Sequence, residues 1–302
     1  MLVWSTIEVG CPMCGQRLRV RELGGGFITG QDSDLLMRMQ GKHVIQAEIN
    51  TCSACRYSGF AFDFLERKVS DPMVERYFRE FAEKLEPESQ DLDSNTKPAR
   101  TPLPHLQYYW SAQLAPLLGL TPKEIGTRML RAYWCLRLEP SSRLPNDQLD
   151  QLDQLYLRQS IAYLRKALRH EKDPTLVYLV AELCRRNGSF VRSKNYFDRL
   201  LDSVTHTSQA RPATGGNCHE YLIRAAEKLH EAARREDSTA KTMEELLYPV
   251  SEGRAGKGRA AEGRAAEGTA PETSDDDSPG RAGTKKNETP KTDKSRKSDG
   301  SQ

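Results

Sequence analysis

The order of apolar and polar residues predicts β-structure near the start of the chain. Residues 3–9 and 18–23 are predicted strands, and residues 44–50 (VIQAEIN) alternate between apolar and polar positions. The glycine-rich residues 24–30 lie between them and are expected to form a flexible excursion. The pattern therefore predicts a small domain of short strands over residues 1–66.

A helix is predicted over residues 67–86. Met73, Tyr77, Phe81 and Leu85 recur every fourth residue and so share one helical face. Asp71 followed by Pro72 is a typical helix start, with an N-cap residue and a proline in the first turn. A polar, proline-containing linker follows over residues 87–104.

Residues 105–235 are predicted to form a helical domain. Three local signals mark the ends of helices within it. They are a capping box at Thr121 and Glu124, an N-cap at Asp173 before Pro174, and the helix stop Asn187-Gly188. The helix after Thr121 is expected to turn Ile125, Met129, Leu130, Tyr133 and Trp134 inward. Predicted helices cover residues 105–118, 121 onward, 148–171, 174–187, 190–203, 217–235 and 239–247.

One internal period is visible in the helical domain. Ser160, Leu164 and Ala167 recur 33 residues later as a similar set, Ser193, Phe197 and Leu200. Such a period is close to the ~34 residues of a tetratricopeptide repeat. The aromatic marker residues of that repeat are missing, so a generic antiparallel helical bundle is the alternative.

Residues 251–302 contain no Val, Ile, Leu, Met, Phe, Trp, Tyr or Cys. Such a segment cannot bury enough apolar surface to offset its loss of conformational entropy. We therefore expect residues 236–302 to be a mostly disordered tail. The predicted fold class is α+β: a β zinc ribbon, a tetratricopeptide-like helical domain and this tail.

Four cysteines provide the strongest chemical pattern in the chain. Cys11 and Cys14 form one C-x-x-C pair, and Cys52 and Cys55 form a second after 37 intervening residues. Two such turns brought face to face present four thiolates in the tetrahedron that Zn²⁺ takes in structural sites. Because four cysteines fill every position, the expected zinc is structural and no catalytic residue is assigned. An iron–sulfur cluster and a redox C-x-x-C motif remain alternatives.

The motifs around these cysteines resemble a bacterial family of uncharacterised proteins called domain of unknown function 2225. The matching segments are Cys11-Pro-Met-Cys14-Gly15, the acidic element from Asp32 to Leu35, and Cys52-Ser-Ala-Cys55 followed by Arg56-Tyr57-Ser-Gly59-Phe60. Ser53 and Arg56 replace the usual proline and glycine of the second motif. The resemblance implies a metal-binding N-terminus and a following helical segment, and it implies no activity.

Several further residues could carry chemistry, but each has a structural interpretation. Asp32 and Asp34 suit a polar loop, or a contact with a partner or with groups near the metal. Cys135 and Cys184 suit core packing, since buried cysteine behaves as a small hydrophobe. Core packing is also expected for Tyr108, Tyr109 and Trp110. The alternative is that they line an interaction groove. His43 is expected at the surface, and no nucleophile–base pair is expected among Cys218, His219 and Glu220.

Charge and composition narrow the range of function classes that fit the sequence. The net charge of +3 does not by itself indicate a nucleic-acid partner, and residues 1–66 hold six basic and seven acidic residues. A basic face of Arg158, Arg165, Lys166 and Arg169 leaves nucleic-acid binding as an alternative. Without a signal peptide or an apolar run of membrane length, we expect a cytoplasmic protein with no membrane contact. The favoured function is a non-enzymatic scaffold that binds a protein partner through its helices; a thiol-based redox sensor is the third possibility.

Overall fold

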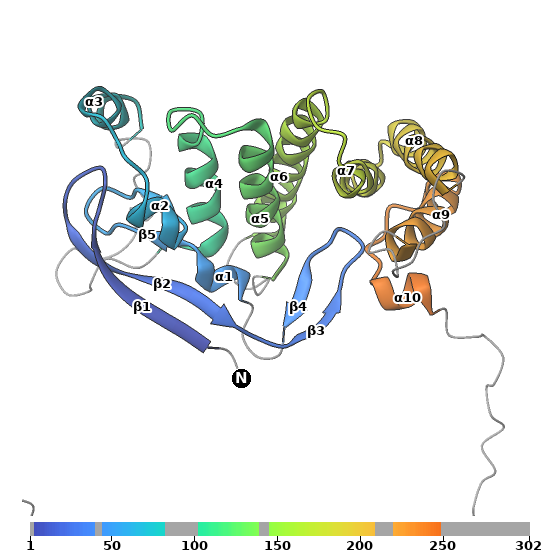
Figure 1. The fold of residues 1–302 in the computed structure, drawn as a ribbon, viewed down its shortest axis with the longest axis horizontal. Coiled ribbons are helices and arrows are strands. Elements are labelled where there is room, and N and C mark those ends of the chain that lie inside the picture. Colours follow the sequence, from blue (N-terminus) through green and yellow to red (C-terminus); the bar gives the residue numbers. More distant parts are fainter. Residues whose placement is uncertain (1–2, 40–43, 82–101, 139–144, 209–219, 249–302) are drawn as a thin grey trace, which may run out of the picture. The chain divides into compact units, whose positions relative to one another are not determined.

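The computed structural model describes residues 3–39, 44–81, 102–138, 145–208 and 220–248. All of them belong to one compact unit, Met1–Ser251. Short antiparallel strands form its N-terminal part and helices form the rest, which confirms the predicted α+β class (Figure 1). The predicted linker up to residue 101, the tail from 251 and His43 lie outside the described residues.

Three two-stranded antiparallel sheets make up the β-structure. Strand β1 (Val3–Gly10) pairs with β2 (Arg17–Gly25), β3 (Ile28–Gln31) with β4 (Met37–Met39), and β5 (Asn50–Thr51) with β6 (Ser58–Gly59). The strands predicted at 3–9 and 18–23 are confirmed. The excursion predicted over residues 24–30 is wrong, because β2 continues to Gly25 and β3 begins at Ile28.

The strand predicted over residues 44–50 is also wrong. Its centre forms a helical turn, α1 (Ile45–Glu48), and only Asn50 of this range belongs to a strand, β5. Ile49 is buried and the hydroxyl of Tyr108 donates to the carbonyl of Ile45 at 2.8 Å, so packing on the later helices fixes this turn. Ile45 and Ile49 are four residues apart, a spacing that also fits a helix, and so short a window does not distinguish the two periods.

Most helices begin and end close to their sequence signals. The helix predicted over residues 67–86 is shorter, because residues 67–70 are not helical and the helix ends at Glu80. Glu124 accepts from the backbone of Thr121 at 2.7 Å, Asp173 accepts from the backbone of Thr175 at 2.9 Å, and Gly188 has φ +69°. The helices are α2 (Ala61–Leu65), α3 (Asp71–Glu80), α4 (Pro104–Leu114), α5 (Pro122–Leu138), α6 (Asn146–Ala167), α7 (Pro174–Arg186), α8 (Phe190–Ser208), α9 (Glu220–Arg234) and α10 (Met243–Leu247). The N-cap of α3 is Ser70, one residue before the predicted Asp71. None of the described helices is long and apolar enough to cross a membrane.

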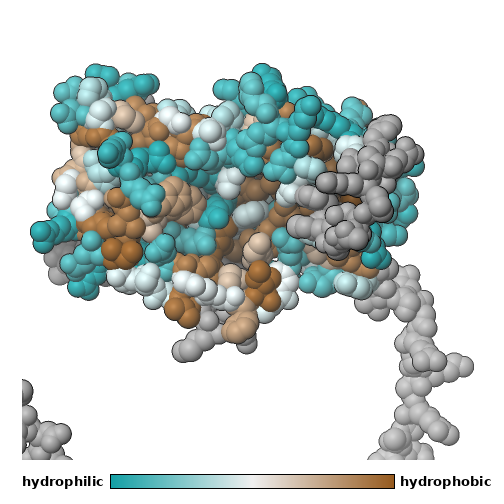
Figure 2. Space-filling view, in the orientation of Figure 1, coloured by the Kyte–Doolittle hydropathy of each residue, from teal (hydrophilic) through white to brown (hydrophobic). Residues whose placement is uncertain are grey.

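Successive helices from α4 to α9 pack on one another, and α10 packs on α9 and on β3. The two recurring sets, from Ser160 and from Ser193, are buried in this packing. Thr242 caps α10, whose Met243 and Leu246 are buried, so residues beyond the predicted end of the helical domain at 235 still pack on it. The apolar residues on the face shown in Figure 2 form several separate patches among hydrophilic ones.

Candidate metal centre

The first cysteine pair lies in a tight turn between β1 and β2. The amide of Cys11 donates to the carbonyl of Gln16 at 2.9 Å, and the amide of Gly15 donates to the carbonyl of Cys11 at 2.8 Å. Gly15 has φ +73°, a left-handed conformation that glycine adopts without steric cost. These bonds bring Cys11 and Cys14 to the same side of the turn.

The second pair repeats the same turn between β5 and β6. The amide of Cys52 donates to the carbonyl of Tyr57, and the amide of Arg56 donates to the carbonyl of Cys52, each at 2.9 Å. Arg56 occupies the position of Gly15 and has φ +64°. The backbone at Arg56 is therefore strained, because a residue with a Cβ pays about 1–2 kcal/mol in this conformation.

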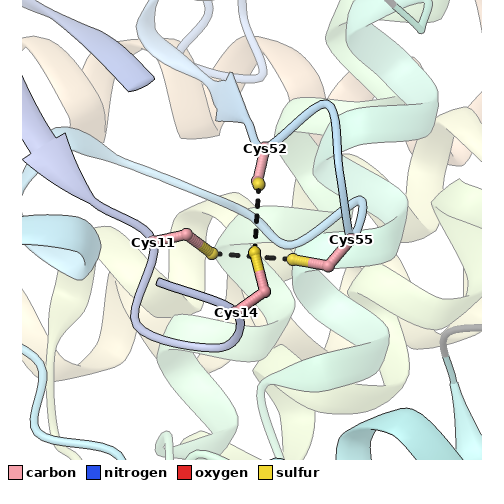
Figure 3. A group of neighbouring side chains, drawn as sticks. All are labelled: Cys11, Cys14, Cys52 and Cys55. Carbon is pink, nitrogen blue, oxygen red and sulfur yellow. Dashed lines mark hydrogen bonds between the residues drawn. The ribbon is translucent and has the colours of Figure 1, made fainter. Parts of the chain in front are cut away.

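The two turns face each other and gather the four sulfurs (Figure 3). All four Sγ atoms lie within 4.8 Å of one another, with Cys11 and Cys55 at 3.5 Å and Cys14 and Cys52 at 3.6 Å. Four sulfurs bound to one ion at about 2.3 Å would stand about 3.8 Å apart. The donor set therefore fits a single tetrahedral ion that leaves no ligand position open.

An apolar cluster surrounds the four cysteines. Cys11, Cys52 and Cys55 are buried and Cys14 is exposed. The hydroxyl of Tyr77, from α3, donates to the carbonyl of Cys55, and Trp110 and Leu114, from α4, belong to the same cluster. The two cysteine turns thus share their core with two helices outside residues 1–66.

Two neighbouring sulfurs, those of Cys11 and Cys55, shift each other's pKa in opposite directions. A hydrogen bond from Cys55 lowers the pKa of Cys11 to about 5. The same hydrogen bond and burial raise the pKa of Cys55, and partial desolvation of the sulfur raises the pKa of Cys14, whose residue is otherwise exposed, to about 11. One thiolate is thus stabilised at the expense of its neighbours, and a divalent cation is what would allow all four to be thiolates.

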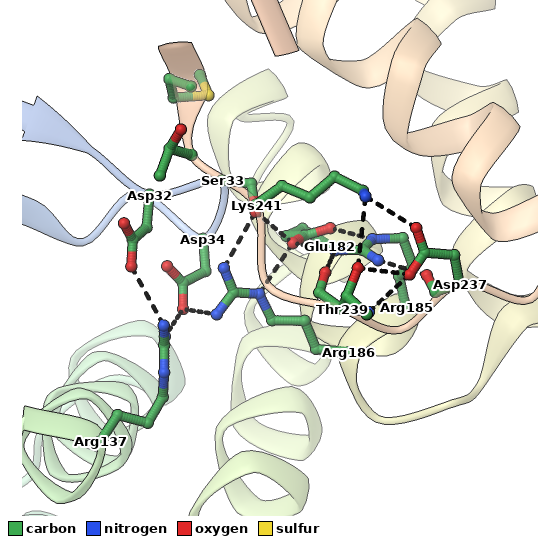
Figure 4. Close-up of polar contacts among 12 residues, drawn as sticks. Asp32, Ser33, Asp34, Arg137, Glu182, Arg185, Arg186, Asp237, Thr239 and Lys241 are labelled. Carbon is green, nitrogen blue, oxygen red and sulfur yellow. Dashed lines mark hydrogen bonds and ion pairs between the residues drawn. The ribbon is translucent and has the colours of Figure 1, made fainter. Parts of the chain in front are cut away.

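Asp32, Ser33 and Asp34, after β3, bind side chains from distant helices (Figure 4). Arg137 of α5 contacts Asp34 at 2.7 Å and Asp32 at 3.2 Å. Arg186 of α7 contacts Asp34 at 2.8 Å. The two aspartates do lie in a turn between β3 and β4, as the loop interpretation expected, but both are buried and are ion-paired with α5 or α7 of the same chain.

Glu182 of α7 extends this network. It accepts from the hydroxyl of Ser33 at 2.6 Å, from Arg185 at 2.7 Å and from Arg186 at 2.9 Å. Burial tends to raise the pKa of Glu182, but the two arginines and Ser33 outweigh it, so the pKa is lowered. Arg185 also donates to the carbonyls of Asp237 and Thr239, and the amide of Ser33 donates to the carbonyl of Lys241 at 2.9 Å. We call these residues the acidic-loop network.

A second buried ion pair joins the N-terminal part to α5. Asp63 of α2 is fully buried and contacts Arg128 at 2.7 Å and Arg67 at 2.9 Å. It also accepts from the backbone of Phe60 at 2.9 Å. Sequence reasoning assigned no role to Asp63 or Arg128. Asp63 stands at the third position of α2, and this was the only local sign in the sequence that it caps the start of that helix.

The other candidate residues do not form a reactive group among those described. Cys135 and Cys184 are buried as expected, and burial raises the pKa of Cys184 to about 11. Tyr108 and Trp110 are core residues. Cys218 and His219 lie outside the described residues, and Glu220 is exposed at the start of α9. Within the described part of the chain, the four cysteines are the one group of three or more His, Cys, Asp or Glu that could hold a metal.

Comparison with curated proteins and with solved structures gives no match. A family model described as an uncharacterised protein conserved in bacteria matches residues 5–214. The match covers more than half of the chain, and it includes both cysteine turns, the acidic-loop residues from Asp32 to Asp34, and the helices from α1 to α8 in full. The chain therefore belongs to the family of domain of unknown function 2225.

Proposed function

We propose that this protein binds one structural Zn²⁺ through Cys11, Cys14, Cys52 and Cys55. The close approach of the four sulfurs, all within 4.8 Å, carries this proposal. A single ion touching every sulfur requires this spacing, whereas an iron–sulfur cluster places several irons between the cysteines and would hold the sulfurs farther apart. Among single ions, four thiolates favour zinc.

Metal analysis of the purified full-length chain tests the proposal. We expect one zinc per chain and little iron by elemental mass spectrometry. Cys52→Ser should lose the metal, and Cys184→Ser, which changes a buried cysteine of α7, should keep it. A chain with iron and acid-labile sulfide in place of zinc would contradict the assignment.

Removing the zinc with a chelator tests whether the ion is needed for the fold. Because the cysteine turns share a core with Trp110 and Leu114 of α4, removing the ion should loosen α4 as well as the strands. Hydrogen exchange measured with and without a strong chelator should show faster exchange in both regions. Unchanged exchange around Cys11 and Cys52 after complete zinc loss would refute a structural role.

We further propose that the protein is a non-enzymatic interaction module whose helices bind a protein partner. The closed cysteine site favours this, since it leaves no position for a substrate. Val191 and Leu155, two apolar residues exposed on the helical region, provide sites for surface changes. Val191→Glu and Leu155→Glu in the full chain should release partners recovered from the native cell, and Lys172→Glu serves as the matched surface control. Retention of every partner by both variants would contradict binding by this surface.

Nucleic-acid binding is the second candidate. Four exposed basic residues lie in and just after α6: Arg158, Arg165, Lys166 and Arg169. The spacings of seven residues from Arg158 to Arg165 and of four from Arg165 to Arg169 place them on one side of the helix. If they bind phosphates, affinity for a duplex DNA or RNA probe should fall steeply with salt, and Arg158→Glu should weaken it. No binding at low salt ends this candidate.

The third candidate is a thiol redox sensor, which the exposure of Cys14 favours. Hydrogen peroxide would oxidise two thiolates to a disulfide, would itself be reduced to water, and the zinc would be released. Mass measurement after mild peroxide treatment should then find a disulfide between Cys11 and Cys14 together with free zinc. Zinc that stays bound under these conditions excludes the sensor.

A further inference from the structure

An open cleft of about 460 Å³ lies between the N-terminal β-structure and α5. One wall is the end of β2 with α1, and the other is the first half of α5. Leu23, Glu48, Phe60, Phe62, Thr127 and Arg131 are among the residues that line it. A cleft of this size between two structural parts is a common place for a ligand or a peptide segment.

One wall of the cleft is a free strand edge. Asn50 caps the edge of β2 that faces away from β1: its side chain accepts from the amide of Arg21 at 2.8 Å and donates to the carbonyl of Arg21 at 3.1 Å. In an antiparallel pair, every second residue directs its amide and carbonyl to the same edge. By this alternation Leu23, two residues further and next to the register shift at Trp4, would direct its amide and carbonyl to this edge.

The cleft also has an apolar floor. The rings of Phe60 and Phe62 stack at 5.5 Å with an angle of 14°, and Phe62 is 47% exposed. The guanidinium carbons of Arg128 and Arg131 lie 4.9 and 4.8 Å from the centre of the Phe60 ring. An apolar side chain placed here would be covered by Phe62 and Leu23.

Arg131, which lines the cleft, has a buried donor without an acceptor in the described part of the chain. It donates through Nη1 to Glu48 and to the hydroxyl of Tyr108, but its Nε is buried and has no acceptor within the described residues. Arg128 is committed to Asp63 and Ser111, and Lys123 to Glu171 and Asp173. A buried donor without an acceptor is unfavourable, so an incoming oxygen at this point would be stabilised.

We propose that this cleft binds an extended peptide of a partner protein as an added strand on the free edge of β2 at Leu23. The amide and carbonyl of Leu23 would pair with the peptide backbone. An apolar side chain of the peptide would pack on Phe60 and Phe62, and an acidic side chain beside it would reach Arg131 and the exposed Arg21. This proposal deepens the proposed interaction function, and it places a partner in the cleft next to α5.

A displayed library of short random peptides, selected on the zinc-loaded full chain, tests the proposal. Selected sequences should combine an apolar residue with an acidic one. In the best binder, methylation of one backbone nitrogen should weaken binding about tenfold at alternate positions only, since one strand-pairing bond is lost at those positions. This readout uses the unaltered protein and so does not depend on whether a variant folds.

Two proline substitutions form a matched pair. Leu23→Pro removes the edge amide, and proline is tolerated where an amide is outside the ladder. Arg19→Pro makes the same change four residues earlier in β2, at a residue that does not line the cleft. Peptide affinity should fall about tenfold or more for Leu23→Pro and for Phe62→Ala, and should be retained in Arg19→Pro.

Three outcomes would overturn the proposal. They are a library without enriched sequences, binding that is equal in Leu23→Pro and in the unaltered chain, and self-association that Leu23→Pro abolishes, which would make a second copy of the chain the occupant. Binding here that survives Val191→Glu and Leu155→Glu separates this site from the helical surface, so that either proposal can fail without the other.

Discussion

At the scale of the residue, the two cysteine turns differ at one position. Gly15 and Arg56 occupy equivalent places and adopt almost the same left-handed backbone, at φ +73° and φ +64°. No atom lies within 4 Å of the place where a Cβ on Gly15 would stand. Backbone conformation alone therefore decides which residue each turn prefers.

Removing the glycine from the first turn and introducing one into the second should change the free energy of unfolding in opposite directions. Gly15→Ala should lower the free energy of unfolding by roughly 1–2 kcal/mol because it places a Cβ in left-handed backbone. Arg56→Gly should raise it by up to about 1 kcal/mol, since relief of that strain exceeds the entropy that glycine gains in the unfolded chain. Denaturant unfolding of zinc-saturated protein measures both.

Arg17→Gly, in β2, is the control for the second change. It introduces the same residue in extended backbone and should therefore destabilise the protein. If Arg56→Gly destabilised the protein as much as Arg17→Gly does, strain at Arg56 would not be the reason for its backbone conformation.

The residues of the metal centre were predictable because their geometry is local. A C-x-x-C turn places its two sulfurs by hydrogen bonds within six residues, and this pattern is visible in the sequence. The capping signals at Thr121, Asp173 and Gly188 are local in the same sense. The turn at Ile45 was not predictable, because contacts with Tyr108 of another helix decide it.

At the scale of the element, α4 connects the metal centre to the helical core. Trp110 and Leu114 pack in the cysteine cluster, while Tyr108 packs in the main helical cluster. His105, at the first turn of α4, is 1% exposed and its Nδ1 lies 3.1 Å from the hydroxyl of Tyr156 in α6. Its Nε2 is buried without a partner among the described residues.

This histidine should make stability depend on pH. Burial lowers the pKa of His105 from 6.5 to about 4, so the folded protein holds the ring neutral where the unfolded chain protonates it. The folded state should therefore lose stability as the pH falls from about 6.5 to 4, by about 3 kcal/mol in total. His105→Gln, which keeps a polar group near Tyr156, should remove this part of the pH dependence.

The measurement is urea unfolding at a series of pH values for both proteins, with bound zinc determined in each sample. Zinc loss at low pH affects the two proteins alike, so the difference between them reports on His105. Parallel curves for the variant and the unaltered chain would show that His105 is not held neutral by burial.

At the scale of the whole molecule, the acidic-loop network holds the N-terminal strands to the helices. Asp34 contacts Arg137 and Arg186, and Glu182 links both Arg185 and Arg186 to Ser33. These contacts from Ser33 and Asp34 to the helices could not be predicted from the sequence, because these partners are 103 or more residues away and charged side chains are usually solvated. The sequence predicted Asp32 and Asp34 as candidates but not their partners.

Removing the charge of Asp34 should strongly destabilise the folded chain. Asp34→Asn keeps the shape of the side chain but leaves Arg137 and Arg186 without their shared carboxylate, at a cost of roughly 3–5 kcal/mol. Glu231→Gln, which breaks an exposed pair with Arg235, should change the free energy of unfolding by no more than about 1 kcal/mol. Chemical unfolding compares the two, and equal effects would show that the network contributes no more than a surface pair.

The acidic-loop network also sets an order of events during translation. Asp34 leaves the ribosome long before Arg137, which is 103 residues away, and Ser33 precedes Arg186 by 153 residues. The cysteine turns can close on a metal as soon as Cys55 has emerged. The acidic loop must wait for α5, α7 and the segment that contains Lys241. The nascent chain can thus close its cysteine turns early but completes its fold late, after nearly all of the helical region has been synthesised.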